Sequence, residues 1–209
     1  MNKRLLIYGV LGLIGVTVGI VLLSYFTSTT AYTITFTHVS RAEVVQNQSD
    51  STSSSPRVVA SVQKSGDTVR LTNGQQYVVQ YVATDGFASG AVTIDKDTNI
   101  SIDPDFSESK YATLITQELP AVRAAITQRY PNVTGLFTID HGAMRGKGIW
   151  FVAQLTYSGE YSLNSDNLRV LLKSEGGQWK LVTQPDIILT TFNYPRLPLS
   201  VLSWANNAF

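Results

Sequence analysis

One uncharged segment near the N-terminus constrains this chain more than any other feature. Leu5–Phe26 contains no charged, amide or proline residue. As a helix rising about 1.5 Å per residue it would extend roughly 33 Å, enough to cross a hydrocarbon core of about 30 Å. Lys3 and Arg4 precede the segment, and the next basic residue is Arg41. This asymmetry predicts a single-pass plasma-membrane protein with a cytoplasmic tail, residues 1–4, and an extracytoplasmic bulk.

A cleaved signal peptide is the alternative interpretation of the same segment. Its apolar part is usually about 7–15 residues long and ends at a small-x-small cleavage site. The segment in this chain is longer, and Thr29-Thr30-Ala31 is a poor site, so an uncleaved transmembrane helix over residues 5–26 is favoured. Gly15 and Gly19 have the small-xxx-small spacing that lets membrane helices approach closely. Helix pairing through these two glycines is a further expectation.

Charge and cysteine content exclude several functional classes. The 209 residues include 16 basic and 15 acidic side chains, a net charge of +1. Residues 30–106 hold five basic and eight acidic residues (net −3), and residues 107–209 hold nine and seven (net +2). Neither part has the strongly basic surface that nucleic-acid binding requires. The chain has no cysteine, so an exported domain without disulfides is expected, as in a bacterial cell envelope.

Residues 30–103 have the pattern of a small β-sandwich. Residues 32–38 alternate apolar or aromatic side chains with threonine, which predicts a half-buried strand that ends near His38. Residues 47–56 are rich in serine and are expected to form a disordered loop. Asn73-Gly74 predicts a tight hairpin between two strands. About six short strands separated by turns are typical of a sandwich.

This region resembles a PEGA-like module, a small extracytoplasmic β-domain of bacterial surface proteins. The resemblance is carried by Leu71-Thr-Asn-Gly74-Gln-Gln-Tyr77-Val-Val and by Asp85-Gly86-Phe87. These stretches give a leucine, a turn glycine, a tyrosine-bearing strand and a glycine–aromatic pair. The Pro-Glu-Gly-Ala signature itself is absent from the chain. The resemblance implies a binding or spacer role without catalysis.

Residues 104–209 change to helical periodicity and then return to strands. From Ser107 to Tyr130, apolar residues recur every three or four positions, which predicts one amphipathic helix that Pro131 ends. Pro120 is expected to kink or split it. Later strands and a glycine-rich loop at 141–148 suggest a sheet curled around the helix, with a short C-terminal helix from Pro198. This order of elements resembles NTF2-like or cystatin-like domains.

The sequence lacks the common motifs of serine hydrolases and zinc peptidases. Neither G-x-S-x-G nor H-E-x-x-H occurs, so no enzyme, metal or cofactor is predicted. The best candidate for a binding site is a cluster of four polar residues that could bind an anion, such as a polymer phosphate or carboxylate. Its members are Asp140, His141, Arg145 and Lys147. The alternative for this group is an ordinary polar hairpin loop.

Together these features predict the α+β class: a transmembrane helix, a small β-sandwich, then a helix packed on a curved antiparallel sheet. The expected function is that of a non-catalytic, membrane-anchored binding or scaffolding protein of the cell envelope. Its expected partners, besides the membrane, are another envelope protein or a cell-wall polymer, and not nucleic acid. The alternatives are a VirB8-like component of a secretion channel and an NTF2-like enzyme with an open pocket.

Overall fold

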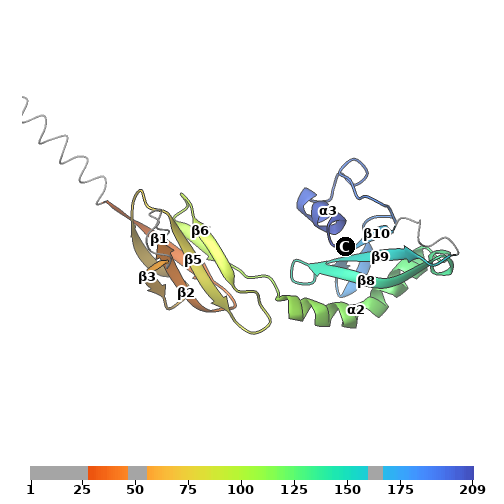
Figure 1. The fold of residues 1–209 in the computed structure, drawn as a ribbon, viewed down its shortest axis with the longest axis horizontal. Helices are drawn as coiled ribbons and strands as arrows, with labels where there is room; N and C mark the ends of the chain where they lie inside the picture. The colour runs from red at the N-terminus through yellow and green to blue at the C-terminus, as the bar shows by residue number, and fades with distance from the viewer. Residues whose placement is uncertain (1–27, 47–55, 160–166) are drawn as a thin grey trace, which may run out of the picture. The chain divides into compact units, whose positions relative to one another are not determined.

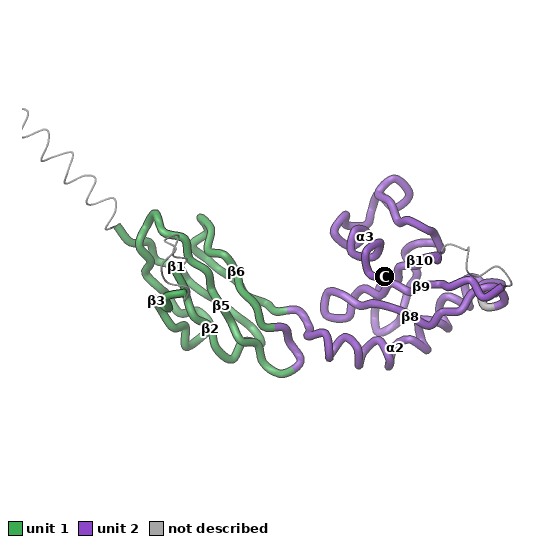
Figure 2. The backbone as a smooth tube through the Cα atoms, in the orientation of Figure 1, with its two compact units in different colours: residues 1–85, 89–104 green, residues 86–88, 105–209 purple. Residues whose placement is uncertain are grey.

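The computed structural model of this protein describes residues 28–46, 56–159 and 167–209. These residues divide into two compact units (Figure 2). Unit 1 contains the described residues up to Asp85 together with Ser89–Pro104, and unit 2 contains Gly86–Ala88 and Asp105–Phe209. Each unit has a hydrophobic interior of its own. The chain therefore passes from one unit to the other more than once.

The predicted α+β class is wrong, because the structure is mostly β. Strands account for 46% of the structure and helices for 19%. The described residues contain two α-helices, α2 (Glu108–Arg129) and α3 (Leu199–Asn206), against eleven strands. Both helices belong to unit 2, so the described part of unit 1 contributes strands and no α-helix.

The prediction of a single-pass plasma-membrane protein is also corrected. In residues 28–46, 56–159 and 167–209, neither helix combines the length and the apolar character needed to cross a membrane. The structure thus gives no support for a transmembrane or single-pass chain with its bulk outside the cell. The predicted span Leu5–Phe26, with Gly15 and Gly19, lies outside the described residues, as does most of the serine-rich loop, residues 47–55.

Unit 1 consists of two sheets that share one core (Figure 1). One sheet has the order β4-β1-β7, with β1 antiparallel to β4 and parallel to β7. The other has the order β3-β2-β5-β6 and is antiparallel throughout. The strands are β1 (Thr29–Phe36), β2 (Val39–Gln46), β3 (Arg57–Val62), β4 (Asp67–Thr72), β5 (Tyr77–Ala83), β6 (Gly90–Ile94) and β7 (Asn99–Ile102).

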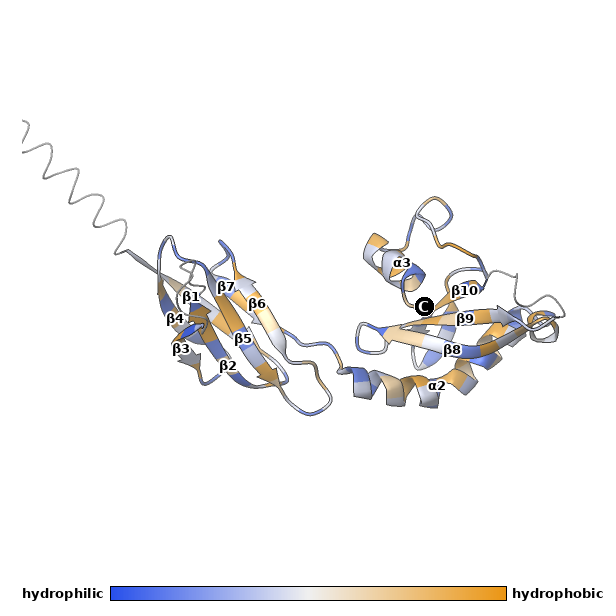
Figure 3. Cartoon of the chain, in the orientation of Figure 1, coloured by the Kyte–Doolittle hydropathy of each residue, from blue (hydrophilic) through white to orange (hydrophobic). Residues whose placement is uncertain are grey.

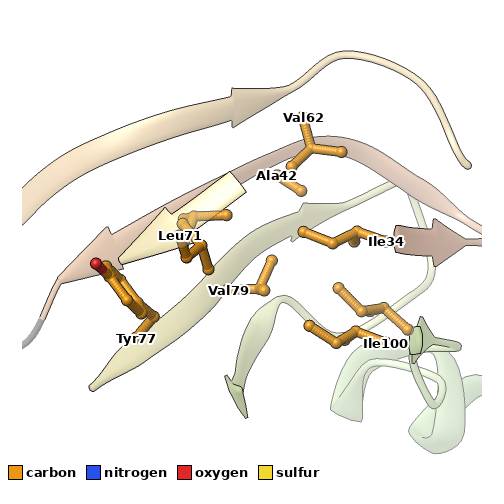
Figure 4. Close-up of a cluster of buried hydrophobic side chains, with 9 residues drawn as sticks. Ile34, Ala42, Val62, Leu71, Tyr77, Val79 and Ile100 are labelled. Carbon is orange, nitrogen blue, oxygen red and sulfur yellow. The ribbon is translucent and has the colours of Figure 1, made fainter. Parts of the chain in front are cut away.

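The core of unit 1 follows from the two-residue period of its strands. Ile34 on β1 is fully buried, whereas Thr35 beside it is exposed, because successive side chains point to opposite faces of a sheet. Val79 on β5 comes from the other sheet and is also fully buried. Figure 4 shows these two side chains together with Leu71 and Ile100 in the space between the strands. Burial of this apolar surface is what holds the two sheets together.

The predicted hairpin at Asn73-Gly74 is wrong, because the strands on either side of it belong to different sheets. β4 pairs with β1, while β5 pairs with β2 and β6. Asn73 instead extends the pairing of β4 with β1: its N–H donates to the Ser28 carbonyl (2.9 Å), and its side-chain amide donates to the Ser28 hydroxyl (2.8 Å). Gly74 has a φ of +80°, which glycine adopts without strain. The turn residues were read correctly, but they connect two sheets.

Unit 2 is one antiparallel sheet with a helix on each face (Figure 1). The order of its strands is β11-β10-β9-β8. Helix α2 lies along one face, and α3 packs on the other. The strands are β8 (Phe137–Arg145), β9 (Trp150–Tyr157), β10 (Leu168–Glu175) and β11 (Gln178–Leu181), and a short 3-10 helix, η1 (Val133–Gly135), precedes β8.

Burial of β9 on both faces explains its consecutive apolar residues Phe151, Val152 and Ala153, and Figure 3 shows hydrophobic colour along this strand. Phe151 and Leu155 pack toward α2, whereas Val152 packs toward α3. Helix α2 begins where the Ser107 hydroxyl accepts the N–H of Lys110 (3.3 Å), a typical N-cap. The helix runs through Pro120 without being split.

The glycine-rich loop predicted at residues 141–148 is largely strand, since β8 continues to Arg145. Gly142 lies opposite Ala153 in the ladder, and a Cβ at this position would collide with the Phe151 ring. This glycine therefore serves close packing within the sheet. The turn itself is confined to Gly146–Ile149, where Gly146, Lys147 and Gly148 all have positive φ.

The collision at Gly142 gives a testable expectation. Gly142→Ala should lower the free energy of unfolding of unit 2 by about 1–3 kcal/mol, because overpacking displaces a buried ring. Urea titration followed by tryptophan emission measures this, since Trp150, Trp179 and Trp204 all belong to unit 2. Gly176→Ala is not a suitable control, because Gly176 has a φ of +61°. Gly135→Ala is suitable, since a Cβ there would meet nothing within 4 Å, and it should leave the midpoint nearly unchanged.

Candidate functional site

The first two residues of the predicted anion site lie at an irregularity in β8. The register with β9 shifts between Thr138 and His141, so Asp140 lies in a bulge of the strand. The Asp140 carboxylate pairs with the guanidinium of Arg123 on α2 at 3.1 Å, and both side chains are largely exposed. His141 is exposed and lies opposite Gln154 in the ladder.

The other two residues of the predicted site point to different parts of unit 2. Arg145 donates from Nη1 to the Ser200 carbonyl of α3 (3.2 Å). Lys147 places its Nζ 5.9 Å from the centre of the Phe87 ring. Asp140 and His141 are thus adjacent, but Arg145 is held by α3 and Lys147 lies near the start of α2. A joint anion site of the four residues stays a prediction.

Lys147 takes part instead in a compact network at the start of α2. Its main-chain N–H donates to Asp105 Oδ1 (3.0 Å) and to the Tyr111 hydroxyl oxygen (2.9 Å). The Tyr111 hydroxyl in turn donates to the same carboxylate oxygen. The N–H of Phe106 is a further donor to Asp105, at 2.8 Å. This carboxylate therefore ties the β8–β9 turn to the first turns of the helix.

The network changes the acidity of both of its side chains. Burial alone would raise the pKa of the Asp105 carboxyl, but hydrogen bonds from Tyr111, Phe106 and Lys147 outweigh burial and lower it below its ordinary value. Burial, together with the neighbouring carboxylate, raises the pKa of the Tyr111 hydroxyl. At neutral pH the carboxylate is therefore ionised and the phenol keeps its proton, which is the state in which the network holds together.

Stability of unit 2 should depend on the ionisation of Asp105. Because its pKa is lower in the folded than in the unfolded chain, its contribution is complete above the unfolded value, about 3.9, and is lost as the pH falls through the folded value. Asp105→Asn should cost about 1–2 kcal/mol at pH 7, since the charge-assisted hydrogen bonds weaken. The difference between wild type and variant should shrink below about pH 4.

Urea titration at pH 7 and pH 3, followed by tryptophan emission, measures both effects. Asp140→Asn is the matched control, because it removes an exposed ion pair that should contribute less than about 1 kcal/mol to the free energy of unfolding. Equal midpoints for wild type and Asp105→Asn at pH 7 would contradict the proposed role of this network.

A hollow of unit 2 lies elsewhere, beside β11. It has a volume of about 820 Å³ and is bordered by the end of α2, by β11 with the residues that follow it, and by the segment at residues 193–194. We call it the β11 groove. Its lining residues are Ala125, Gln128, Arg129, Tyr130, Trp179, Lys180, Leu181, Val182, Thr183, Gln184, Asn193 and Tyr194.

Three aromatic side chains line the β11 groove. Trp179 is fixed by a hydrogen bond from its indole N–H to Glu118 Oε2 on α2 (2.8 Å) and by an edge-to-face contact with Phe151, with ring centres 5.6 Å apart. The Tyr194 hydroxyl accepts the N–H of Gln184 (3.3 Å). Tyr130 follows the last turn of α2. The aromatic part of the lining is therefore held in place by helix, strand and loop together.

The charged groups of the lining are cationic. Arg129 and Lys180 contribute the positive charges, and the described lining residues include no aspartate, glutamate or histidine. Burial raises the pKa of the Tyr194 hydroxyl above its ordinary value. At neutral pH, Tyr194 is thus an uncharged hydrogen-bonding group, and the groove as a whole is suited to polar or anionic ligands with apolar parts.

No local sequence pattern indicates this groove. Trp179 and Leu181 were recognised as strand residues, but their position at the edge of the sheet depends on the strand order, which no single segment specifies. The clearest available signal was the concentration of Trp179, Tyr130 and Tyr194 in one domain, since aromatic residues are enriched at binding sites.

Comparisons with family models, with curated proteins and with solved structures find no match to this chain. The resemblances to PEGA-like, NTF2-like and cystatin-like domains therefore stay predictions. The function has to be inferred from the geometry of the chain itself.

Proposed function

We propose that this chain is a non-catalytic binding protein that holds its partner in the β11 groove. The observation that carries the proposal is the coincidence, in one hollow, of three aromatic side chains and the edge of a sheet. Its volume of about 820 Å³ lies within the range of about 300–1,000 Å³ common for ligand sites. Aromatic residues provide large contact areas at a small entropic cost, which favours binding.

The chemistry of the lining supports binding over catalysis. General acid–base catalysis needs a group that titrates near the working pH and lies within hydrogen-bond reach of a substrate. The ionisable side chains of the described lining are those of Arg129, Lys180 and the two tyrosines, and the Tyr194 pKa is raised further from neutrality. Arg129 and Lys180 can bind and orient a ligand, and Tyr194, which keeps its proton at neutral pH, is a poor base.

Site-directed photo-crosslinking of the full chain in its natural host tests this function. The photoreactive residue p-benzoylphenylalanine replaces Gln128, which lines the groove, or Gln117, its control. Both glutamines are exposed residues of α2, and their separation of eleven positions returns to nearly the same side of the helix. We expect a discrete adduct from position 128 that is absent at position 117. Equal adducts from both positions, or none from position 128, would overturn the proposal.

A further inference from the structure

We infer that the β11 groove takes an acidic polypeptide segment in extended conformation, which pairs with β11 as a fifth strand of the sheet. This inference rests on the proposed function and specifies the chemical class and the binding mode of the partner. Three observations carry it: the direction of the main-chain groups of β11, the course of the groove along this strand, and the charge of the lining.

The first observation is that, within residues 28–46, 56–159 and 167–209, one side of β11 has no neighbouring strand. The N–H of Val182 donates to the Leu171 carbonyl (2.9 Å), whereas the N–H of Ser174 points away from β11, to the Ile149 carbonyl (2.8 Å). In an antiparallel sheet, the main-chain N–H and C=O groups of every second residue point to the same neighbouring strand. By this alternation the main-chain groups of Gln178 and Lys180 point to β10. The N–H and C=O groups of residues 179 and 181 point outward from the sheet.

The second observation is that the groove follows this edge. Six consecutive residues, 179–184, line it: the first three belong to β11, about 10 Å of extended chain, and the other three follow the strand. The Trp179 and Leu181 side chains pack toward α2, so side chains of an added strand on that face would lie near Gln128 and Arg129. At the far end Tyr194 accepts the N–H of Gln184, which closes the path. Strand addition of this kind draws affinity from main-chain hydrogen bonds and specificity from alternate side chains.

The third observation is charge complementarity. Arg129 and Lys180 lie on two sides of the groove, and no carboxylate belongs to its described lining. Lys180 shares Glu175 with Lys173, at 3.0 and 3.2 Å, so two cations meet one anion beside the strand. An incoming segment with aspartate or glutamate would supply the missing negative charge.

Exposed edges are usually protected from pairing, and a short strand bearing a lysine is one such protection. β11 has four residues and carries Lys180, so protection alone would explain these two features. It does not explain a hollow of about 820 Å³ lined by three aromatic rings along the same edge. A lysine at this edge also selects against basic segments and admits acidic ones.

Selection from a displayed library of random dodecapeptides on the full chain tests the inference. We expect selected peptides rich in Asp and Glu that crosslink to the photoreactive residue at position 128. The strongest peptide is then synthesised with N-methyl groups on alternate amides, in each of the two possible phases. One of these two methylated peptides should bind about as well as the parent peptide. The other should bind more than about tenfold more weakly, because it loses the hydrogen bonds to β11.

Variants of the chain test the charge. Arg129→Gln combined with Lys180→Gln should weaken binding of the acidic peptide about three- to thirtyfold, with a weaker salt dependence. Arg57→Gln combined with Lys96→Gln is the matched control, because it removes the same charge from exposed positions of unit 1. The control pair should leave the affinity within about twofold.

The possible outcomes separate the two proposals. Peptides that crosslink at position 128 but tolerate both methylation phases equally would overturn strand pairing and leave the binding function standing. Selected peptides without acidic residues, or equal effects of the two double variants, would overturn the acidic specificity. Failure to select any peptide that crosslinks at position 128 would overturn the inference as a whole, while adducts from the host would still report on the proposed function.

Discussion

Replacing Phe151 by alanine is expected to lower the free energy of unfolding of unit 2 by about 3–5 kcal/mol, the usual cost of deleting a buried aromatic ring. Phe151 lies on β9 with no exposed surface and packs toward α2. Its ring contacts Trp179 edge to face, with centres 5.6 Å apart. Gly142 leaves the space that the ring fills. Its loss would open a cavity under the helix that neither strand nor helix can close.

Tryptophan emission during urea titration of the full chain measures this loss, because all three tryptophans are in unit 2. Phe192→Ala is the matched control: the same substitution is made in the same unit, at a side chain that is 93% exposed. It should change stability by less than about 0.5 kcal/mol. A loss below about 1 kcal/mol for Phe151→Ala would show that the interior between α2 and the sheet is not closely packed.

Ile34→Ala should have a similar effect on unit 1, with a cost of about 2–5 kcal/mol. Ile34 is fully buried and lies on β1, the strand to which both β4 and β7 pair. It packs in the core that joins the two sheets (Figure 4). A cavity at this position would loosen both sheets, because each of them depends on the shared interior for its stability.

Hydrogen exchange measured by mass spectrometry follows unit 1, which contains no tryptophan. Peptides from β1, β2 and β5 should exchange much faster in Ile34→Ala than in wild type. Val82→Ala on β5 is the control, since Val82 is 51% exposed, and protection in that variant should match wild type closely. Unchanged protection in Ile34→Ala would exclude Ile34 as a contributor to the core.

The sequence predicted individual elements better than it predicted their partners. The expected helix from Ser107 to Tyr130 corresponds to α2, because its apolar period and its serine cap are local signals. Asn73-Gly74 was recognised as a turn, but whether a turn joins strands of one sheet or of two depends on contacts far along the chain. For the same reason Gly142 was mistaken for a loop residue. A glycine is needed there because the Phe151 ring on the neighbouring strand leaves no room for a Cβ.

The candidate sites show the same limit. Asp140, His141, Arg145 and Lys147 were grouped because they are close in sequence, but a strand rises about 3.3 Å per residue and turns neighbouring side chains to opposite faces. The β11 groove instead collects Tyr130, Trp179 and Tyr194 from three elements. Only the order of the strands makes β11 an edge, and only the fold brings these rings together.

The path of the chain between the two units has a consequence for how this protein can be cut or recombined. Gly86–Ala88 belongs to unit 2, although residues on both sides of it belong to unit 1. Phe87 forms a β-bridge with Phe106, and their rings are 5.3 Å apart. A fragment that starts at Asp105 would therefore lack Phe87, the residue of unit 2 that contacts Phe106. A single crossover point along the chain can therefore not exchange unit 2 whole.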